Sequence, residues 1–344
     1  MKPTAPPTFS DVPIRLHELV HGYRTTCVIV AALELGLIEA LRAAPIAEAH
    51  LAERLGAHEA SLKRFLRALS SLDVIEYRPE GVALTASGRL LLEGDAAMRE
   101  RTILARDEYL HAWLRLSHSV MTGDPAFDHV FGMSAWEHRR CHPELNECMN
   151  RTMADDHSRA RGAIAEAYDF SNCRLVIDVG GGHGALLAEI LGRHPQPKGL
   201  LFDQPHVVAG ATNLLARAGV LERCEIVGGS FFDRVPPGGD MYLLQRVLHD
   251  WSDPHCKAIL RNCRVAMEPG TTLLVIENLM PDRDEPSPHL VMVDLHMMAM
   301  LGGRERTCGE YRSLLEASGF KLVRSQSARG NAEILVAVPV AMPP

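Results

Sequence analysis

A cluster of glycines separates an apolar run from a helical pattern in VIDVGGGHGALL, residues 176–187. Gly180, Gly182 and Gly184 let the backbone turn tightly and let a ligand approach the N–H groups at the start of a helix. About twenty residues further on, Asp203 ends the next apolar run, where a carboxylate can accept both hydroxyl groups of an adenosine ribose. The pattern predicts a site for an adenosine-containing cofactor; the alternative is a tight structural turn beside a surface aspartate.

Two classes of cofactor fit this glycine loop. The spacing Gly180-x-Gly182-x-x-Ala185 satisfies the dinucleotide fingerprint of NAD-binding proteins. Asp178 instead favours S-adenosylmethionine (SAM), because an acid at the end of the strand can help to hold the amino-acid end of that molecule. SAM brings no pyrophosphate, so the loop needs no lysine or arginine, and it has none. We expect SAM; a dehydrogenase is the weakest alternative, since nothing resembling a hydride-transfer site accompanies the loop.

An ionisable ring ends a second apolar run, YLLQRVLHDWSD, residues 242–253. The apolar residues predict a buried strand, and His249 follows its carboxyl end. Open α/β sheets bind their ligands at that edge, so an imidazole there can face a substrate. A single histidine at such a place is more often structural, and its spacing alone does not assign it a role.

Strands and helices alternate from Cys173 onward, which predicts a doubly wound α/β domain with a mostly parallel sheet. We expect strands over 173–179, 198–203, 224–229, 240–247, 271–277, 320–326 and 332–338, and helices over 184–193, 206–218, 253–267, 288–300 and 308–318. Only SARGN, residues 327–331, joins the last two strands, which is too short for a parallel crossover. The last strand should therefore be antiparallel, a feature that also favours SAM over NAD.

The first half of the chain is mainly helical in pattern. Helices expected over 49–56 and 59–72, followed by two short strands over 73–85, are typical of a winged-helix module. Amphipathic segments continue to about Ala167. We expect three parts: a winged-helix-like domain over 1–100, a helical connector over 101–170 that contributes to the substrate pocket, and a cofactor-binding catalytic domain over 171–344.

The composition is that of a soluble globular protein. The 344 residues are 47% hydrophobic and 23% charged, with a net charge of −7, which argues against nucleic acid or an anionic membrane surface as the main partner. The N-terminal segment lacks an apolar signal region, and no apolar stretch reaches spanning length, so we expect a cytoplasmic protein. Eight scattered cysteines without a CxxC pair predict free thiols and no metal site.

Five segments together identify a family. They are DVGGGHG (178–184), FDQPHVV (202–208), GGSFFDRVP (228–236), LHDWSD (248–253) and GGRERT (302–307). Their order and spacing resemble those of SAM-dependent O-methyltransferases of the plant caffeate and hydroxyindole type and their bacterial secondary-metabolism relatives. The resemblance covers nearly the whole chain and implies a class I SAM-methyltransferase fold, Rossmann-like, behind an N-terminal dimerisation module. It further implies a homodimer that methylates a hydroxyl group of an aromatic small molecule.

By this resemblance His249 is the general base. A neutral imidazole, with an ordinary pKa near 6.5, can take the proton of a phenol as its oxygen attacks the methyl group. Such proton transfer typically contributes about 10²–10⁴-fold. Glu277 and Glu305 occupy positions where relatives carry glutamates beside the base, and a carboxylate on one ring nitrogen fixes the tautomer. The alternatives are a helix-capping acid for Glu277 and, for Glu305, a solvated charge paired with Arg304 or Arg306.

Other positions depart from the family pattern. Ser230 stands where plant members carry aspartate and can still bond the adenine amino group, while Phe231 can cover the purine face. Gln245 replaces a lysine of the plant members, and we expect its neighbour Arg246 to contact the cofactor; an ordinary exposed arginine is the alternative.

The acceptor pocket is the least defined part of the site. Its candidates are Trp113, Met153, Asp250, His296, Met297 and Met300. Polarizable methionines suit an aromatic acceptor, although methionines at helical spacing are usually core residues. The resemblance leaves N- or C-methylation open, and also non-methylating chemistry on the same fold.

A transcriptional regulator is the alternative from a different class. The helix expected over 59–72 carries Lys63, Arg64 and Arg67, which can meet DNA phosphates. The acidic net charge and the intact methyltransferase half favour a dimerisation role for this module instead.

Overall fold

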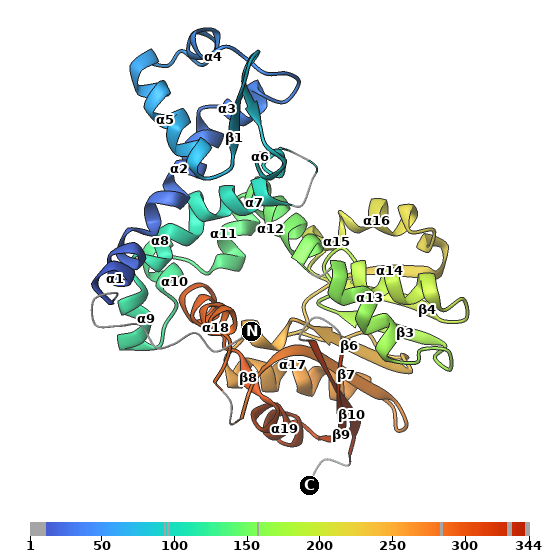
Figure 1. Ribbon diagram of the computed structural model, residues 1–344. Coiled ribbons are helices and arrows are strands. Elements are labelled where there is room, and N and C mark those ends of the chain that lie inside the picture. The colour runs from blue at the N-terminus through green and yellow to red at the C-terminus, as the bar shows by residue number, and fades with distance from the viewer. Residues whose placement is uncertain are drawn as a thin grey trace, which may run out of the picture. The chain divides into compact units, whose positions relative to one another are not determined.

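The computed structural model describes residues 12–92, 94, 97–156, 158–282, 285–328 and 332–340. The first eleven residues, where no secretion signal is expected, lie outside this range, as do residues 329–331 of the short link between the last two strands. The chain divides into two compact units, Met1–Asp107 and Glu108–Pro344 (Figure 1). Each unit has a core of its own.

The first unit is a small helical domain with a two-stranded wing. It contains α1 (Val12–His21), α2 (Tyr23–Glu34), α3 (Leu37–Ala40), α4 (Glu48–Leu55), α5 (Glu59–Ser71), β1 (Ile75–Arg78), β2 (Gly81–Leu84), α6 (Ala86–Arg89) and α7 (Met98–Leu104). A left-handed Gly56 ends α4, and α5 buries Leu62, Leu66 and Leu69 along one face. The strands β1 and β2 pair antiparallel. The expected order of helix, turn, helix and wing is confirmed.

A helical segment opens the second unit after a π-helical turn over Ala105–Tyr109. It consists of α8 (Leu110–Trp113), α9 (Leu116–Thr122), α10 (Ala126–Phe131), α11 (Ala135–Cys141), α12 (Pro143–Asp156) and α13 (Ser158–Ala167). Phe127 of α10 and Ala135 of α11 share a small core with Met300, the last residue of α18 (Pro288–Met300). This segment is therefore anchored to the helix that follows the central strands.

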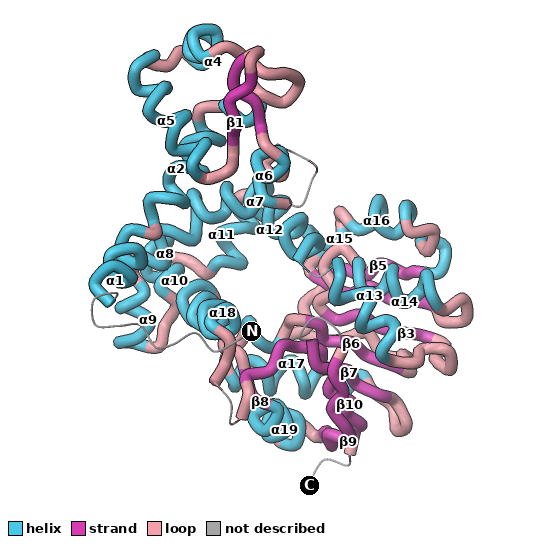
Figure 2. Tube along the Cα trace, in the orientation of Figure 1, coloured by secondary structure: helices cyan, strands magenta, loops and turns pink. Residues whose placement is uncertain are grey.

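The central sheet has the order β5-β4-β3-β6-β7-β10-β9, with the short β8 beside β7 (Figure 2). Its strands are β3 (Leu175–Val179), β4 (Lys198–Asp203), β5 (Cys224–Gly228), β6 (Met241–Gln245), β7 (Thr272–Met280), β8 (Arg306–Thr307), β9 (Phe320–Ser327) and β10 (Ala332–Pro339). Strands β3 to β7 are parallel, whereas β10 is antiparallel to both neighbours. The reversed last strand is confirmed, and it lies between β7 and β9 rather than at the edge.

Helices cover both faces of this sheet, as continuous apolar strands require. They are α14 (Ala185–Arg193), α15 (Pro205–Val208), α16 (Ala211–Arg217), α17 (Asp253–Ala266) and α19 (Cys308–Glu316). Alternate residues of β3 face opposite layers: Ile177 and Val179 pack with α17 and α19, and Val176 packs with α13, α14 and α16 (Figure 1). The two layers hold the carboxyl ends of the strands, and hence the expected site residues, in fixed positions.

One strand departs from the expected boundaries. We expected the strand carrying Glu277 to end there, but β7 continues to Met280 because Leu279 and Met280 pair with β8. Glu277 is therefore inside a strand and completely buried. Within the described residues, no helix combines the length and the apolar character needed to span a membrane.

Candidate active site

The glycine loop wraps closely around the end of β3. Gly180 adopts φ 72°, and a Cβ there would lie 2.8 Å from Cγ2 of Val247. A Cβ at Gly181 would lie 2.6 Å from the carboxylate of Asp178. The loop backbone is also fixed from the next strand, because the amide of Gly182 donates to Asp203 Oδ2 at 2.8 Å. Only glycine fits these positions, so the loop stays open to a ligand.

Asp178 is a buried acid without a protein partner. Its side chain is 1% exposed, and among the described residues neither carboxylate oxygen has a hydrogen-bond partner. Burial, with a smaller contribution from Asp203, raises the pKa of Asp178 from 3.8 to about 7. A buried carboxyl group is stable only when a donor or a cation reaches it. Asp178 is therefore suited to hold a cationic group of a ligand.

Of the two residues expected at the adenine, Phe231 lies beside the glycine loop. A Cβ at Gly180 would be 3.5 Å from Phe231 Cε1, and the ring of Phe231 meets Trp251 edge-on at 6.1 Å between centroids. The hydroxyl of Ser230 accepts a hydrogen bond from the amide of Phe232 and so stabilises its own turn. An adenine contact of Ser230 stays a prediction.

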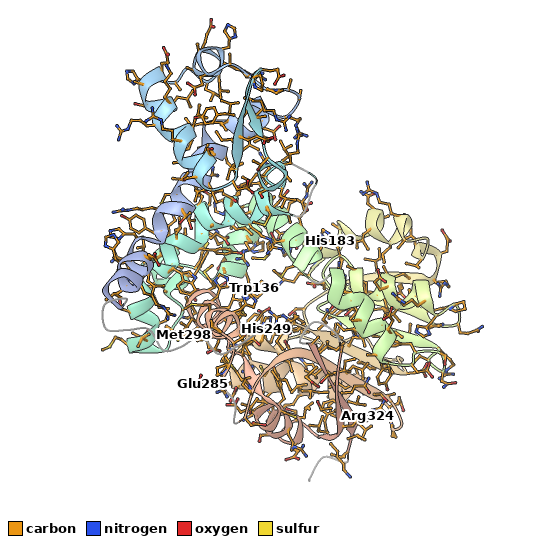
Figure 3. The ribbon with its side chains drawn as sticks, in the orientation of Figure 1. Trp136, His183, His249, Glu285, Met298 and Arg324 are labelled. Atoms are coloured by element: carbon orange, nitrogen blue, oxygen red, sulfur yellow. The ribbon has the colours of Figure 1, made fainter. Side chains whose placement is uncertain are left out.

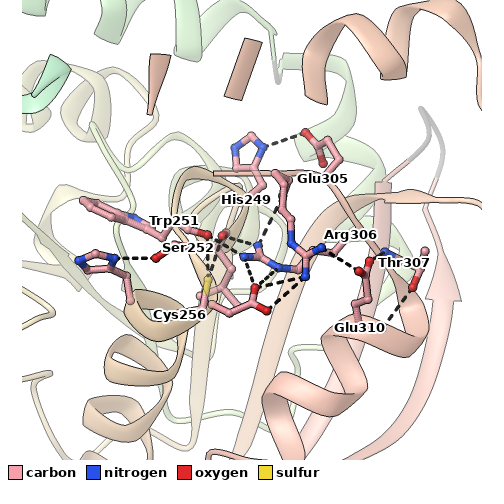
Figure 4. A network of polar contacts seen from close by, with 12 residues as sticks. His249, Trp251, Ser252, Cys256, Glu305, Arg306, Thr307 and Glu310 are labelled. Atoms are coloured by element: carbon pink, nitrogen blue, oxygen red, sulfur yellow. Dashed lines mark hydrogen bonds and ion pairs between the residues drawn. The ribbon is translucent and has the colours of Figure 1, made fainter. Parts of the chain in front are cut away.

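His249 lies in a buried 3-10 turn, Leu248–Asp250, just beyond β6. Its Nδ1 is 2.9 Å from Glu305 Oε1 (Figure 4), and its Nε2 is 3.2 Å from Asp250 Oδ1. Burial and the charge of Arg246 act to lower the pKa of His249. The carboxyl groups of Asp250, Glu277 and Glu305 outweigh them and raise the pKa above its ordinary 6.5. The ring is therefore held between two acids, one on each nitrogen.

Glu305 is the ionised partner in this pair. Burial acts to raise the pKa of Glu305, but the hydrogen bond to His249 and the charges of Arg246 and Arg306 outweigh it and hold the pKa below 4.5. A carboxylate can only accept, so Nδ1 of His249 carries the proton of this hydrogen bond. Nε2 is left as the atom that can take a proton from a substrate. Glu305 is thus a buried partner of the ring and not a solvated loop charge.

Glu277 holds the same turn in a different way. Its Oε1 accepts hydrogen bonds from the amides of Leu248 at 3.0 Å and His249 at 3.4 Å, and its side chain is fully buried. Burial raises the pKa of Glu277 to about 7. We expected both glutamates to orient or polarise the ring; the structure shows Glu305 on Nδ1 and Glu277 on the backbone.

Arg246 lies beside this pair rather than in open solvent. Its Nη1 is 3.6 Å from Glu305 Oε1, and its amide donates to the carbonyl of Ile276. Its backbone is left-handed, with φ 53°, which is unfavourable for a residue with a Cβ and is found at sites that the surroundings constrain. A contact of Arg246 with the cofactor stays a prediction.

Two of the expected pocket residues meet through a hydrogen bond. Nε1 of Trp113 donates to Nδ1 of His296 at 3.1 Å, and Tyr109 meets His296 edge-on at 4.7 Å between ring centroids. Burial, Arg139 and His249 together lower the pKa of His296 to about 4, so this imidazole is neutral near pH 7. These rings form an aromatic group close enough to His249 for its charge to lower the pKa of His296.

The methionine candidates do not join this group equally. Met300 is buried in the small core with Phe127, and Met297 is also buried. Met153, on α12, is 41% exposed. A core role therefore describes Met300 better than a place in the pocket. Asp250, by contrast, lies 3.2 Å from Nε2 of His249.

Several residues around the site have no recognisable signal in the sequence. Trp136 of α11 stacks on Trp251 at 5.5 Å between centroids (Figure 3 labels Trp136 near His249). Asp294 of α18 accepts the amide of Glu305 at 2.8 Å. The only hint was the GGRERT segment, whose Arg306 is completely buried. Among the described residues, no group of three or more histidine, cysteine or acidic side chains is placed to bind a metal ion.

Two family models match the chain. Residues 17–94 match the O-methyltransferase dimerisation domain, and residues 113–321 match the O-methyltransferase domain. The second range includes the glycine loop, His249, Glu277 and Glu305. The two matches thus cover most of the wing-bearing unit and the strands from β3 to β8.

Individual proteins are similar over nearly their whole length. The chain is 39% identical to a phenazine O-methyltransferase of Lysobacter antibioticus, over 94% of this chain and 96% of that protein. It is 42% identical to a 3-amino-4-hydroxybenzoate 4-O-methyltransferase of Streptomyces cremeus (90% and 85%) and 33% identical to aclacinomycin 10-hydroxylase of Streptomyces purpurascens (94% and 88%). One similar crystal structure holds an O-methyltransferase from neocarzinostatin biosynthesis with SAM and 2-hydroxy-5-methyl naphthoic acid. Its TM-score is 0.80 at 30% identity, over 92% of this chain and 96% of that one.

Proposed function

The chain belongs to the O-methyltransferase family, and we propose that it transfers a methyl group from SAM to a hydroxyl group of an aromatic small molecule, with His249 as the general base. The observation that carries this proposal is the buried pair of His249 and the ionised Glu305, which leaves Nε2 as the proton acceptor. The pair lies beyond the carboxyl end of β6, at the sheet edge where ligands bind in open α/β folds.

The residues at the glycine loop fit SAM. Asp178 offers two buried carboxylate oxygens without hydrogen-bond partners among the described residues, which suits the ammonium group of SAM. Asp203 is fixed by backbone amides and can accept the ribose hydroxyls, and Phe231 can cover the purine. When bound, SAM supplies a methyl group on a cationic sulfur, open to in-line attack by an oxygen nucleophile. The crystal structure of the relative with SAM supports this assignment.

The base acts through Nε2 of His249. Because Nδ1 donates to the ionised Glu305, Nε2 receives the proton of the acceptor hydroxyl and the imidazolium is stabilised by that carboxylate. Asp250 Oδ1 lies 3.2 Å from the same nitrogen, and its carboxyl group also favours the imidazolium.

The acceptor we propose is a hydroxylated aromatic compound of the natural-product type. Tyr109, Trp113 and His296 supply flat, largely apolar surfaces that suit an aromatic ring, near the charge of His249. Relatives named for phenazine and 3-amino-4-hydroxybenzoate support an aromatic acceptor. The relative named as a hydroxylase is a second candidate reaction. The complete His249–Glu305 pair favours methyl transfer, since a proton acceptor of this kind serves a hydroxyl nucleophile.

We further propose that the protein is a homodimer. Leu16, Leu19, Val20 and Tyr23 are exposed at the spacing of one helical face, within a region that largely matches the dimerisation domain. Contiguous exposed apolar residues of this kind mark an interface. A cytoplasmic location remains a prediction of the sequence.

A panel of phenols, hydroxyquinones and aromatic hydroxy acids, incubated with methyl-labelled SAM, tests the proposed reaction. We expect at least one compound to gain one labelled methyl group, and NMR of that product should place the group on oxygen. A methyl group found only on nitrogen or carbon would contradict the proposal, as would a product that gains oxygen and no methyl group.

A further inference from the structure

We propose that Arg306 is a positioning residue for His249: it fixes the turn that carries the base by binding the backbone carbonyls on both sides of it. The proposal rests on the base role of His249 proposed above. Arg306 has no hydrogen bond to the imidazole, so its main action on the reaction is through the turn. Its neighbour Glu305 acts on the ring itself.

The contacts of Arg306 surround the turn. Its Nη1 donates to the carbonyl of Leu248 at 2.9 Å, and its Nη2 donates to the carbonyl of Trp251 at 2.7 Å (Figure 4). Nε and Nη2 also bind Asp253 Oδ1, at 3.1 and 2.8 Å, in the first turn of α17. The bonded carbonyls lie just before and just after His249 and Asp250. One planar guanidinium therefore fixes the ends of the turn relative to α17.

Two adjacent residues hold one turn from different directions. Arg306 opens β8, which pairs with β7 at Leu279, and Glu305 comes just before this strand. Glu305 reaches the ring of His249, while Arg306 reaches the carbonyls of the turn.

Residues just before Glu305 press against the same turn. The amide of Arg304 donates to the carbonyl of His249 at 2.9 Å. A Cβ at Gly303 would lie 2.0 Å from that carbonyl oxygen, so only glycine allows this approach. Residues 303–306 thus contact the turn through each of their four members, and Arg306 alone does so through a buried cation.

The amides of the turn meet a hydrogen-bond acceptor, and its carbonyls meet hydrogen-bond donors. The amides of Leu248 and His249 point to the carboxyl group of Glu277, and the carbonyl of Leu248 points to Arg306. Cys256 adds a weak thiol donor to the Leu248 carbonyl at 3.1 Å. The amides of Leu248 and His249 thus have an acceptor and the carbonyls of the same two residues have donors, which favours one orientation of the turn. That orientation sets where Nε2 of His249 points.

Arg306 has a second effect, through Glu305. Its charge is one of the groups that lower the pKa of Glu305 and keep that side chain ionised. Loss of this cation would favour the protonated forms of the groups near it, so the pKa of Glu305 would rise and the pKa of His249 would not fall. Lysine in place of Arg306 keeps the charge but lacks the planar guanidinium that binds both carbonyls. It would therefore move the turn and leave the pKa of Glu305 in place.

These two effects allow a test with Arg306→Gln and Arg306→Lys. We expect kcat to fall by about 10²-fold in both, because a displacement of about 1 Å at a reacting group can cost that much. The KM of the acceptor and the dissociation constant of SAM should be unchanged. The acidic limb of the kcat/KM profile should stay in place in Arg306→Lys and should not shift to lower pH in Arg306→Gln, because loss of a nearby cation favours the imidazolium.

Arg223→Gln is the matched control. Arg223 also binds backbone carbonyls, those of His194 at 3.0 Å and Pro197 at 2.9 Å, before the amino ends of β4 and β5. Its loss should lower thermal stability in the same way and leave kcat unchanged. Because Arg306→Lys keeps the buried charge, it also serves if Arg306→Gln does not fold.

The inference is overturned if Arg306→Lys keeps the wild-type kcat, or if kcat in the Arg306 variants falls no further than in Arg223→Gln at an equal loss of melting temperature. Loss of turnover in His249→Ala alongside normal turnover in Arg306→Lys would refute the positioning role and leave the proposed function intact. Normal turnover in His249→Ala would refute the proposed function itself.

Discussion

The sheet edge has two halves: the one at Asp178, which we propose binds the cofactor, and the one at His249, which we propose carries the catalytic residues. Their buried acids differ in the partners that they have. On the cofactor side, Asp178 has no hydrogen-bond partner among the described residues, and burial raises its pKa to about 7. On the catalytic side, Glu305 is ionised and bound to His249 at 2.9 Å. Both carboxyl groups are almost completely buried, so their partners and not their depth make the difference.

This contrast indicates that the two sides differ in how far the protein itself fixes their polar groups. The catalytic side is preorganised: its imidazole, its carboxylate and the turn between them are bound to protein groups before any substrate arrives. On the cofactor side, the carboxyl group of Asp178 has no hydrogen-bond partner among the described residues, and we propose that a cationic group of the cofactor supplies one. Each prediction below tests one side of the comparison.

Loss of the base should have the largest effect. We expect His249→Ala to lower kcat by about 10²–10⁴-fold, the usual contribution of a positioned general base. Calorimetry should show unchanged SAM affinity, because the ring lies on the catalytic side. His255→Ala is the matched control: this nearby histidine is exposed and its Nδ1 bonds to Ser252. Equal activity of the two variants would contradict the base role.

The two glutamates should differ sharply in the same assay. Glu305→Gln removes the ionised partner of Nδ1 and should lower kcat by about 10²-fold. Glu277→Gln keeps an oxygen that can accept from both amides of the turn, and burial already raises the pKa of Glu277 to about 7, so its kcat should fall by less than about tenfold. A larger loss in Glu277→Gln than in Glu305→Gln would reverse the assignment of the two acids.

Asp178→Asn separates stability from binding. Because the pKa of Asp178 rises from 3.8 to about 7 on folding, the folded state binds more protons between those values, and the free energy of unfolding falls as pH rises through that window. The asparagine variant should lose this decline and melt higher at pH 8 without SAM. Its SAM affinity should fall by about tenfold or more, as expected for a lost charged hydrogen bond. Unchanged SAM affinity would remove Asp178 from the cofactor site.

The pH dependence of turnover should follow the raised pKa of His249. A base must be neutral to accept a proton, so kcat/KM should rise with pH through a pKa above 6.5 and then level off. Asp250→Asn removes an acid 3.2 Å from Nε2 and should shift this limb to lower pH. A wild-type limb centred below 6.5 would show that the carboxyl groups do not control the ring.

The smallest effect on chemistry should come from the first unit. Leu19→Glu places a charge on the exposed apolar face of α1 and should give monomers in light scattering. Val265→Glu, at an exposed position on α17, is the control and should stay dimeric. A dimeric Leu19→Glu would show that this face is not the interface.

Much of the fold could be predicted from the sequence. Parallel strands of a covered sheet are nearly continuous apolar runs, so β3 to β7 were found within a few residues, and the link after Ser327 showed that the last strand must be antiparallel. The two-residue β8 has no pattern to detect, and neither the extension of β7 to Met280 nor the placement of β10 inside the sheet could be foreseen.

The site was only partly predictable. The types of His249 and Glu305 and the family motif singled out two side chains that the structure places 2.9 Å apart. The partner of Glu277 is the backbone, which no residue type reveals. Nothing in the sequence marks Arg306 as buried, because arginine is rarely buried without a partner. The partners of Arg306 are backbone carbonyls and Asp253, which only the fold brings near it.

The protonation of the His249 ring tests the central claim most directly. ¹⁵N NMR of histidine-labelled protein, with the signals of His249 assigned by their loss in His249→Ala, reports each ring nitrogen separately. We predict that Nδ1 keeps its proton at all pH values and that Nε2 loses its proton with a pKa above 6.5. A neutral ring that carries its proton on Nε2 would contradict the account, because that nitrogen could not then accept a proton from the substrate.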